Sequence, residues 1–409
     1  MSGDMVLWYN WSQALGAWDW RRFYAASGCD YTPGYLYILW VLGKIQFGAP
    51  HAPVFLRAVL PTGALLYKLP AMAADVATVV LLYVVGKRWG YAGAGYLAAL
   101  SYAFNPGIIF NSSRWGQVDS IPALFMVVAL VLLIESRPVL FGIALALSIV
   151  CKPTALILVP LCLVVLLRRG RYKDVMSACV SGLVTVAVVF FPFIPPRTNP
   201  IEFIHHLYTA LSGEYPFLTL NAFNLWLLVQ GHVALLSDSA TIMGVPCAVA
   251  GWVLLAGLAA LACIAAARRT NLLDDVEWPR TALPAAAVVL LGFFILLTRM
   301  HERHLLPALP MLAMTCVIWP RFWLPYCWLS FAYFLNLRYV FYLFWPYGEH
   351  DLGEAAIKTI ALVNVAMLGV AAVMLMYIVL PLRTTVTTWW RTMGEAQRLA
   401  ALPGQGSAE

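Results

Sequence analysis

Long apolar runs separated by short charged loops are the feature that most constrains how this chain folds. Of its 409 residues, 62% are hydrophobic and only 11% are charged. A helix needs about 20 apolar residues to cross a bilayer, whereas a soluble protein of this size carries far more surface charge. The sequence therefore predicts an all-α, polytopic transmembrane helical bundle with the lipid bilayer as its surroundings.

The expected spans share a nearly unbroken apolar composition. They are Pro70–Gly86, Tyr91–Phe110, Ile121–Ile134, Val139–Leu167, Val175–Ile194, Thr241–Ala267, Leu283–Thr298, Leu305–Trp319, Trp323–Phe344 and Ile357–Leu380. Lys152-Pro153 interrupts the fourth run, and proline removes a helical hydrogen bond. This predicts a helical hairpin with Lys152 at its turn. Residues 35–47 are too short for a relaxed span and could dip into the membrane, with residues 57–68 as the return.

Three parts follow from this pattern. They are an extracytoplasmic or re-entrant helical segment (1–69), a transmembrane core (70–382) with a long outer loop (197–233) that contains a short amphipathic helix, and a cytoplasmic tail (383–409).

The net charge of +7 comes from basic residues in short loops between the apolar runs. Such a distribution is a topology signal, since Lys and Arg favour the cytoplasmic side. No basic-aromatic groove accompanies it, so nucleic acid is not an expected partner. With the basic loops in the cytoplasm, alternation places the remaining polar segments on the opposite face: residues 1–34, Asn111–Ser120, Lys152, 197–233, Arg299–His304 and 347–354.

The segment Arg299–His304 is the most polar of these, because five of its six residues can carry charge. Charges in lipid are costly, so this cluster belongs at a membrane face or in a wet cavity. Arginine matches phosphate well, which makes Arg299 and Arg303, with His301, Glu302 and His304, candidates for an anionic group. The alternative is a charged surface turn that has no role in binding or catalysis.

A metal site is not predicted. His301 and His304 are three residues apart, not four as in the HExxH zinc motif. No cofactor is expected, and dependence on a divalent metal stays open.

Two carboxylates, Asp4 and Asp30, fall on the outer face. A carboxylate that takes a proton from a sugar hydroxyl is a general base. Capping of the helix that begins near Pro33 is the alternative for Asp30, and a solvated terminal charge is the alternative for Asp4. Lys152 is a cation in an apolar context, which marks it as a functional candidate or as a residue that snorkels to the interface.

The turn around Trp115 is compact and polar. Gln117 and Asp119 could orient a sugar, or Trp115 could anchor at the interface while Asp119 caps the next helix. Asn221 and Asn224 lie in the long outer loop, where a plain amphipathic helix also explains their neighbours.

Together these segments are similar to the GT-C glycosyltransferases. Gly3-Asp4, Phe23-Tyr24 and Asp30-Tyr31-Thr32-Pro33 resemble that superfamily's first luminal loop. Further marks are Trp115–Ser120, Lys152-Pro153, Asn221–Trp226 and Met300–Arg303. The nearest likeness is to bacterial and archaeal mannosyltransferase-like proteins related to the GPI mannosyltransferases. A more distant one is to the dolichyl-phosphate-glucose-dependent enzymes of N-glycan assembly.

The resemblance implies transfer of a hexose, with mannose favoured, from a polyprenyl-phosphate donor. The acceptor would be a hydroxyl on a glycan, lipid or protein, and the anomeric configuration would be inverted. The active site would face outward from a bacterial or archaeal cell membrane, or into the lumen of the endoplasmic reticulum. It implies Asp4 as the base, Asp30 as a second acid or acceptor binder, and His301, Glu302 and Arg303 near the donor phosphate.

Arg299 and Lys152 join the candidates for the donor phosphate. The candidates for substrate binding are Tyr24, Arg114, Gln117, Asp119, Asn221 and Asn224. The sequence departs from the GT-C pattern in having Thr32 where proline is frequent and in lacking the usual helix ahead of Asp4. Two alternatives stay open: a transporter or flippase of lipid-linked sugars, and a non-catalytic subunit of a glycan-assembly complex.

Overall fold

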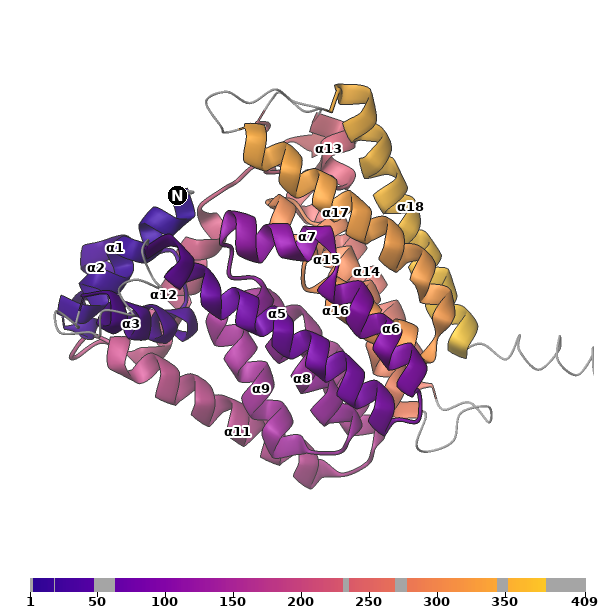
Figure 1. Cartoon of the computed structure of the whole chain (residues 1–409), viewed down its shortest axis with the longest axis horizontal. Coiled ribbons are helices and arrows are strands. Elements are labelled where there is room, and N and C mark those ends of the chain that lie inside the picture. Colours follow the sequence, from indigo (N-terminus) through magenta and orange to yellow (C-terminus); the bar gives the residue numbers. More distant parts are fainter. Residues whose placement is uncertain are drawn as a thin grey trace, which may run out of the picture.

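The computed structural model describes residues 3–17, 19–47, 63–230, 235–268, 278–343 and 352–379. Helices form almost all of this part (Figure 1). Its one sheet is a short hairpin of β1 (Thr241–Ile242) and β2 (Val245–Pro246). The predicted all-α class is confirmed.

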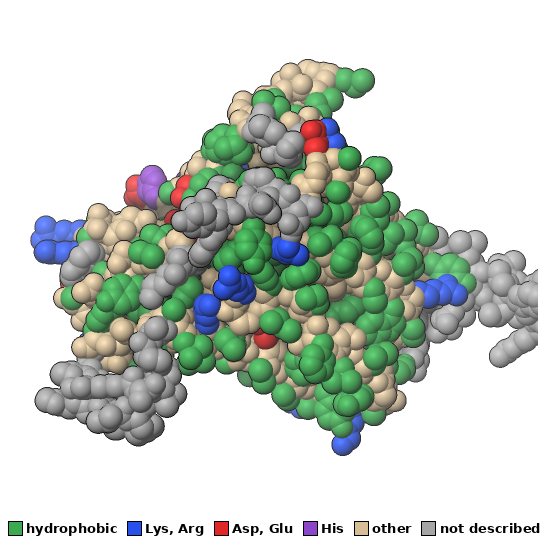
Figure 2. Space-filling model, turned by 45° about the horizontal axis from the view of Figure 1, so that its top comes forward, with side chains coloured by type: hydrophobic (Ala, Val, Ile, Leu, Met, Phe, Trp, Pro, Cys, Tyr) green, Lys and Arg blue, Asp and Glu red, His purple; other side chains and the backbone are tan. Residues whose placement is uncertain are grey.

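Four of the described helices are long and apolar enough to cross a membrane: α5 (Gly63–Arg88), α11 (Tyr172–Phe190), α14 (Cys247–Ala267) and α18 (Glu354–Val379). Shorter apolar helices, among them α8 (Ser120–Ile134) and α9 (Pro138–Cys151), lie beside them. Figure 2 shows a face on which hydrophobic side chains predominate and charges are sparse. A surface of this kind suits lipid, and the polytopic prediction is confirmed.

The centre of the bundle is formed by the two helices that flank the charged cluster. Nearly every residue of α15 (Ala282–Leu296) and α16 (Ala308–Ile318) is buried. Both helices are apolar on all sides, which is the pattern of a helix surrounded by protein or lipid. The cluster between them is therefore held on the most deeply packed part of the fold.

The predicted span Tyr91–Phe110 is wrong as a single helix. The chain forms α6 (Ala92–Ala103), α7 (Pro106–Ile109) and then a π-helical turn, η2 (Phe110–Trp115). The break lies at Asn105, whose side-chain oxygen accepts hydrogen bonds from the Gly107 and Ile108 amides. An N-cap followed by proline starts a new helix.

The predicted break at Lys152 is confirmed. Here α9 ends, and a 3-10 segment, η3 (Pro153–Leu158), leads into α10 (Val159–Arg168). Lys152 is extended, with φ −157° and ψ 129°, because a residue before proline is pushed out of the helical region. The guanidinium of Arg169 donates to the Leu133 and Ile134 carbonyls, so α10 returns to the end where α8 finishes.

The basic loops meet at one end of the bundle. Arg88 pairs with Glu135 at 3.2 Å, and Arg168 donates to the Ala267 carbonyl at 2.8 Å. Arg280 lies over the Trp89 ring, 5.2 Å from its centroid. These contacts join loops that are 47 to about 190 residues apart in the chain, so the loops sorted to one side by their charge share one end in space.

The amino-terminal helices form a unit at the opposite end. It consists of α1 (Gly3–Ala17), α2 (Phe23–Ser27) and α3 (Pro33–Phe47), which lie together in Figure 1. The three helices share a core rich in aromatic side chains. A Cβ added to Gly34 would lie 2.6 Å from the Val150 carbonyl oxygen, so α3 packs backbone to backbone against α9. This contact places the loop with Asp30 beside Lys152.

The remaining elements complete the same end. The outer loop contains α12 (Pro200–Gly213) and α13 (Leu225–Gln230), and α12 is the amphipathic helix expected there. The predicted span Trp323–Phe344 forms α17 (Trp323–Leu343), and the last predicted span corresponds to α18. The tail 383–409, residues 347–351 of the polar segment 347–354 and residues 57–62 of the predicted return lie outside the described residues.

Candidate functional site

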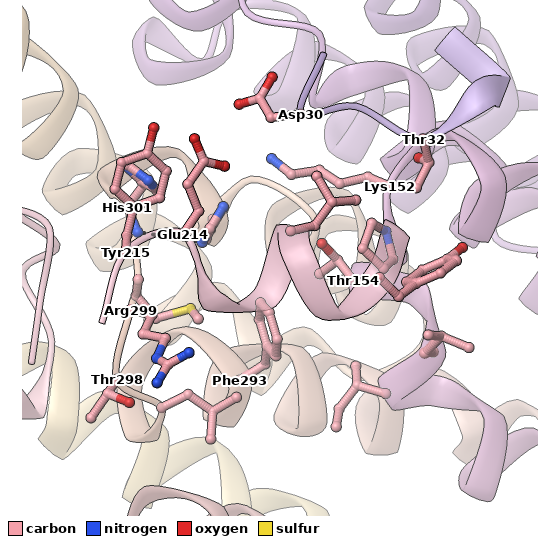
Figure 3. Close-up of a pocket in the computed structure, with 18 of the residues that line it drawn as sticks. Asp30, Thr32, Lys152, Thr154, Glu214, Tyr215, Phe293, Thr298, Arg299 and His301 are labelled. Atoms are coloured by element: carbon pink, nitrogen blue, oxygen red, sulfur yellow. Dashed lines mark hydrogen bonds between the residues drawn. The ribbon is translucent and has the colours of Figure 1, made fainter. Parts of the chain in front are cut away.

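A cavity of about 890 Å³ opens where the amino-terminal unit, α12, α14 and the cluster after α15 come together. Figure 3 shows Asp30, Lys152, Glu214 and His301 around one part of it, with Arg299 and Phe293 in another. Its polar wall includes Asp30, Tyr31, Lys152, Glu214, Asp238, Arg299, His301, Arg303 and His304. Its apolar wall includes Leu156, Ile157, Leu211, Trp252, Phe293 and Leu297.

Lys152 reaches the cavity from the helix break and forms an ion pair with Asp119. The side chains of the two residues are 16% and 1% exposed. Asp119 precedes α8 but makes no capping hydrogen bond, so the capping interpretation of Asp119 is wrong. The pair fixes the ammonium group at the site, whereas a snorkelling lysine would extend to water.

Asp4 is anchored in the first turn of α1. Its Oδ2 accepts hydrogen bonds from Trp115 Nε1 at 3.2 Å and from Gln117 Nε2 at 2.8 Å. Trp8 Nε1 also donates to the Gly116 carbonyl at 3.3 Å. The interpretation of Asp4 as a solvated terminal charge is therefore wrong, and the polar turn holds this carboxylate in place.

Asp30 lines the cavity. Its Oδ1 is buried and has no hydrogen-bond partner among the described residues. Burial raises the pKa of the Asp30 carboxyl, Glu214 and Asp4 raise it further, and Arg303 opposes them. Helix capping does not account for a buried oxygen without a partner. Glu214, at the end of α12, was not a candidate from the sequence because nothing marks a lone glutamate in an outer loop.

Short backbone pairing holds the charged cluster. The Arg299 amide donates to the Phe217 carbonyl at 3.0 Å, and the Leu220 amide donates to the Met300 carbonyl at 2.9 Å. Arg299 and Asn221 both have φ of +62°, a region that side chains rarely occupy. Backbone held this way at two facing positions indicates that the surroundings fix the loop.

Asp238 is a second residue that the sequence did not single out. Its Oδ2 accepts hydrogen bonds from Arg299 Nε at 2.6 Å and from Thr298 Oγ1 at 3.2 Å. Asp238 is only 3% exposed, so it orients a guanidinium that lines the cavity. Its partner lies about sixty residues away in the chain, and no short-range pattern reveals such a pair.

The histidines of the cluster carry less positive charge than expected from the sequence. Burial lowers the pKa values of His301 and His304, with Arg303 and Lys152 adding to the effect. Both imidazoles are therefore neutral at pH 7, and the expectation that they are cations is corrected. Glu302 is buried and pairs with Arg303 Nη1 at 3.3 Å, so it balances that guanidinium and is not among the cavity-lining residues.

Several predicted binding residues have structural contacts instead. The Tyr24 hydroxyl donates to the Tyr31 carbonyl at 2.8 Å. The exposed Arg114 lies over the Phe341 ring at 5.3 Å. Asn224 is fully buried and caps α13 through the Trp226 and Leu227 amides, while the Asn221 carbonyl accepts from Asn336 Nδ2 at 2.7 Å. None of these four candidates lines the cavity.

Among the described residues, no group of three His, Cys, Asp or Glu side chains is placed to hold a metal ion. The electrostatic contacts instead tie the carboxylates to the cations. The charges that act on Arg303 come from Glu302, Asp4 and Asp119, and Asp30 is also within its reach. Asp4, Asp30, Lys152 and Arg303 thus converge on one end of the bundle.

An all-α bundle with lipid-length helices and a charged cavity at one end defines a polytopic membrane protein with a candidate active site. The family model described as glycosyltransferase family 87 matches residues 50–277, more than half of the chain. The chain belongs to this family and is a membrane glycosyltransferase. No curated protein matches it. The matched region contains Asp119, Lys152, Glu214 and Asp238.

Proposed function

We propose that this glycosyltransferase moves a hexose from a polyprenyl-phosphate donor to an acceptor hydroxyl, with inversion. Mannose is the hexose that we favour. The observation that carries the proposal is the pairing of cations and carboxylate across one cavity. Lys152, Arg303 and Arg299 line it together with Asp30. This is the arrangement that a sugar phosphate requires, with fixed positive charge for the phosphate and a base for the attacking hydroxyl.

The apolar wall supports a lipid-linked donor. Leu156 on η3 and Trp252 on α14 both line the cavity and remain 46% and 56% exposed on the bundle surface. Apolar side chains that reach from a polar site to a membrane-facing surface suit a polyprenyl chain. A soluble nucleotide sugar would gain nothing from such a wall.

The reaction is a single displacement. The acceptor oxygen bonds to the anomeric carbon while the bond from that carbon to the phosphate oxygen breaks, and the electron pair leaves with the phosphate. Asp4 or Asp30 takes the proton of the acceptor hydroxyl. Arg303, Lys152 and Arg299 hold the growing phosphate charge, for which preorganised groups contribute about 3 kcal/mol each.

The proposed site faces away from the cytoplasm. The support is the sorting of charge, because Arg88, Arg168, Arg169 and Arg280 gather at the other end of the bundle and basic loops favour the cytoplasm. Residues 1–69 then form the extracytoplasmic or re-entrant segment that carries Asp4 and Asp30, and the acceptor is a glycan, lipid or protein on that side.

Replacing the two acids separately by asparagine tests the mechanism. Transfer from a labelled polyprenyl-phosphate hexose should fall at least 100-fold in the variant that lacks the base. Asp19→Asn is the matched control, because Asp19 lies in the same unit, caps a short helix through the Arg21 amide, and asparagine caps equally well. Full transfer by both Asp4→Asn and Asp30→Asn would refute the mechanism.

A further inference from the structure

We infer that the Tyr31 hydroxyl is a further catalytic group, which donates a hydrogen bond to the phosphate oxygen that leaves the sugar. This inference rests on the proposed function. Tyr31 lines the cavity from the amino-terminal unit, which also carries the two carboxylates, and Arg303 lines it from the loop after α15.

The Tyr31 ring is held on several sides. Its centroid lies 4.9 Å from that of Trp8 at 81°, 5.9 Å from that of Trp11, and 6.0 Å from that of Tyr35. The contact with Trp8 is edge-to-face and the other two are tilted, so three rings restrict the orientation of Tyr31. Its backbone is fixed as well, since the Tyr31 carbonyl accepts from the Tyr24 hydroxyl at 2.8 Å and its amide donates to Cys29 Sγ at 3.4 Å.

Charge surrounds the hydroxyl of this fixed ring. Arg303 acts on it from the η6 turn (Glu302–Leu305), Asp119 from the start of α8, Asp4 from α1, and Asp30 from the preceding position. Burial, with the three carboxylates, raises the pKa of the phenol well above its ordinary value. The hydroxyl therefore keeps its proton, and a protonated phenol in the cavity that Arg303 also lines is a donor for an anion.

This position gives Tyr31 a defined task. As the bond between the anomeric carbon and the phosphate oxygen breaks, negative charge grows on the phosphate. A neutral donor aimed at that charge strengthens its hydrogen bond in the transition state, and the proton stays on the tyrosine throughout. The positive charge of Arg303 is partly balanced by its ion pair with Glu302. A second hydrogen-bond donor therefore adds to the stabilisation of the phosphate.

The chain offers a matched control for the hydroxyl. Tyr35 lies in α3, four positions after Tyr31, in the same aromatic cluster; its ring centroid is 5.3 Å from that of Trp8, and the residue is 1% exposed. Its hydroxyl is buried and has no partner among the described residues, and Tyr35 is not a cavity-lining residue. Tyr31→Phe and Tyr35→Phe therefore remove the same atom from the same cluster, one at the cavity and one away from it.

The experiment measures two quantities for the full-length protein in nanodiscs. One is kcat for transfer from a polyprenyl-phosphate hexose, and the other is Kd for polyprenyl phosphate, the sugar-free product. Tyr31→Phe should lower kcat about 10- to 100-fold and weaken product binding about 10-fold, as expected for a lost hydrogen bond to a charged group. Tyr35→Phe should match the wild type in both.

Three results would overturn the inference. Unchanged kcat and Kd in Tyr31→Phe would exclude the hydroxyl as a phosphate donor while wild-type transfer still upheld the proposed function. Equal losses in both variants would show that the effect lies in the aromatic packing. A wild type that binds polyprenyl phosphate but never cleaves the donor would refute the proposed function and, with it, the catalytic role of Tyr31.

Discussion

The ion pair of Lys152 with Asp119 allows stability and activity to be separated in one set of variants. Both side chains are nearly inaccessible, with 16% and 1% of their surfaces exposed. Replacing Lys152 by methionine keeps the apolar stem and leaves the Asp119 carboxylate buried without its counter-ion. Breaking a buried pair from one side costs about 3–5 kcal/mol, so we expect Lys152→Met to lose about that much unfolding free energy.

The double variant Lys152→Met with Asp119→Asn should recover most of this stability, because a neutral pair no longer buries an unpaired charge. Its transfer activity should stay low, since the variant lacks the cation that we propose for the donor phosphate. Activity and stability thus move apart, which a purely structural lysine would not produce.

The free energy of unfolding is measured in mixed detergent micelles with SDS as the denaturant. The KM for a polyprenyl-phosphate hexose is measured on the same variants. Glu135→Gln is the control, because the charge it leaves behind is that of Arg88, whose side chain is 62% exposed at the other end of the bundle, and a pair screened by water contributes about 0.2–1 kcal/mol. The reasoning fails if the double variant regains wild-type activity, or if Lys152→Met is no less stable than Glu135→Gln.

Three further predictions concern the acids and the packing around the cavity. If Asp30 is the base, its raised pKa means that activity should be lost on acidification at a pH above the ordinary pKa of aspartate. Glu214→Gln removes one cause of the raised pKa, so the acidic limb of the pH–rate profile should move to lower pH. Asp238→Asn should weaken the hold on the Arg299 guanidinium and raise the donor KM about 10-fold with little change in kcat, and a change in kcat alone would contradict this. Gly34→Val should separate α3 from α9 and lower the apparent Tm, whereas the exposed Gly3→Ala should not.

The sequence predicted the elements whose signals are local. Apolar runs of bilayer length and the proline at residue 153 each act within one stretch of chain, and the spans and the break at Lys152 follow from them. The charges of the loops likewise divided the loops into two groups, one for each membrane face, because each loop's Lys and Arg residues favour the cytoplasmic side independently of the other loops.

Some misses had signals that were present in the sequence. Asn105-Pro106 is a helix start, yet the apolar run around it led to the prediction of one span where two short helices form. Asn224 likewise has the chemistry of an N-cap, which is the role that the structure gives it.

Other features lie beyond any local pattern. The partner of Arg299 is Asp238, 61 positions away in the sequence, and the partner of Lys152 is Asp119, 33 positions away. The protonation of His301 depends on burial and on Arg303 and Lys152 around it. Each of these is set by tertiary packing, so sequence alone could propose the cluster's residues but not their charges or their partners.

Donor cleavage is the measurement that tests the central claim most directly. Proteoliposomes that hold the purified protein and a native lipid extract as the acceptor source are given a polyprenyl phosphate whose hexose is labelled. We predict that the label leaves the donor, joins an acceptor with inverted anomeric configuration, and leaves free polyprenyl phosphate behind. Movement of intact labelled donor across the bilayer, without cleavage, would contradict the account and identify a flippase.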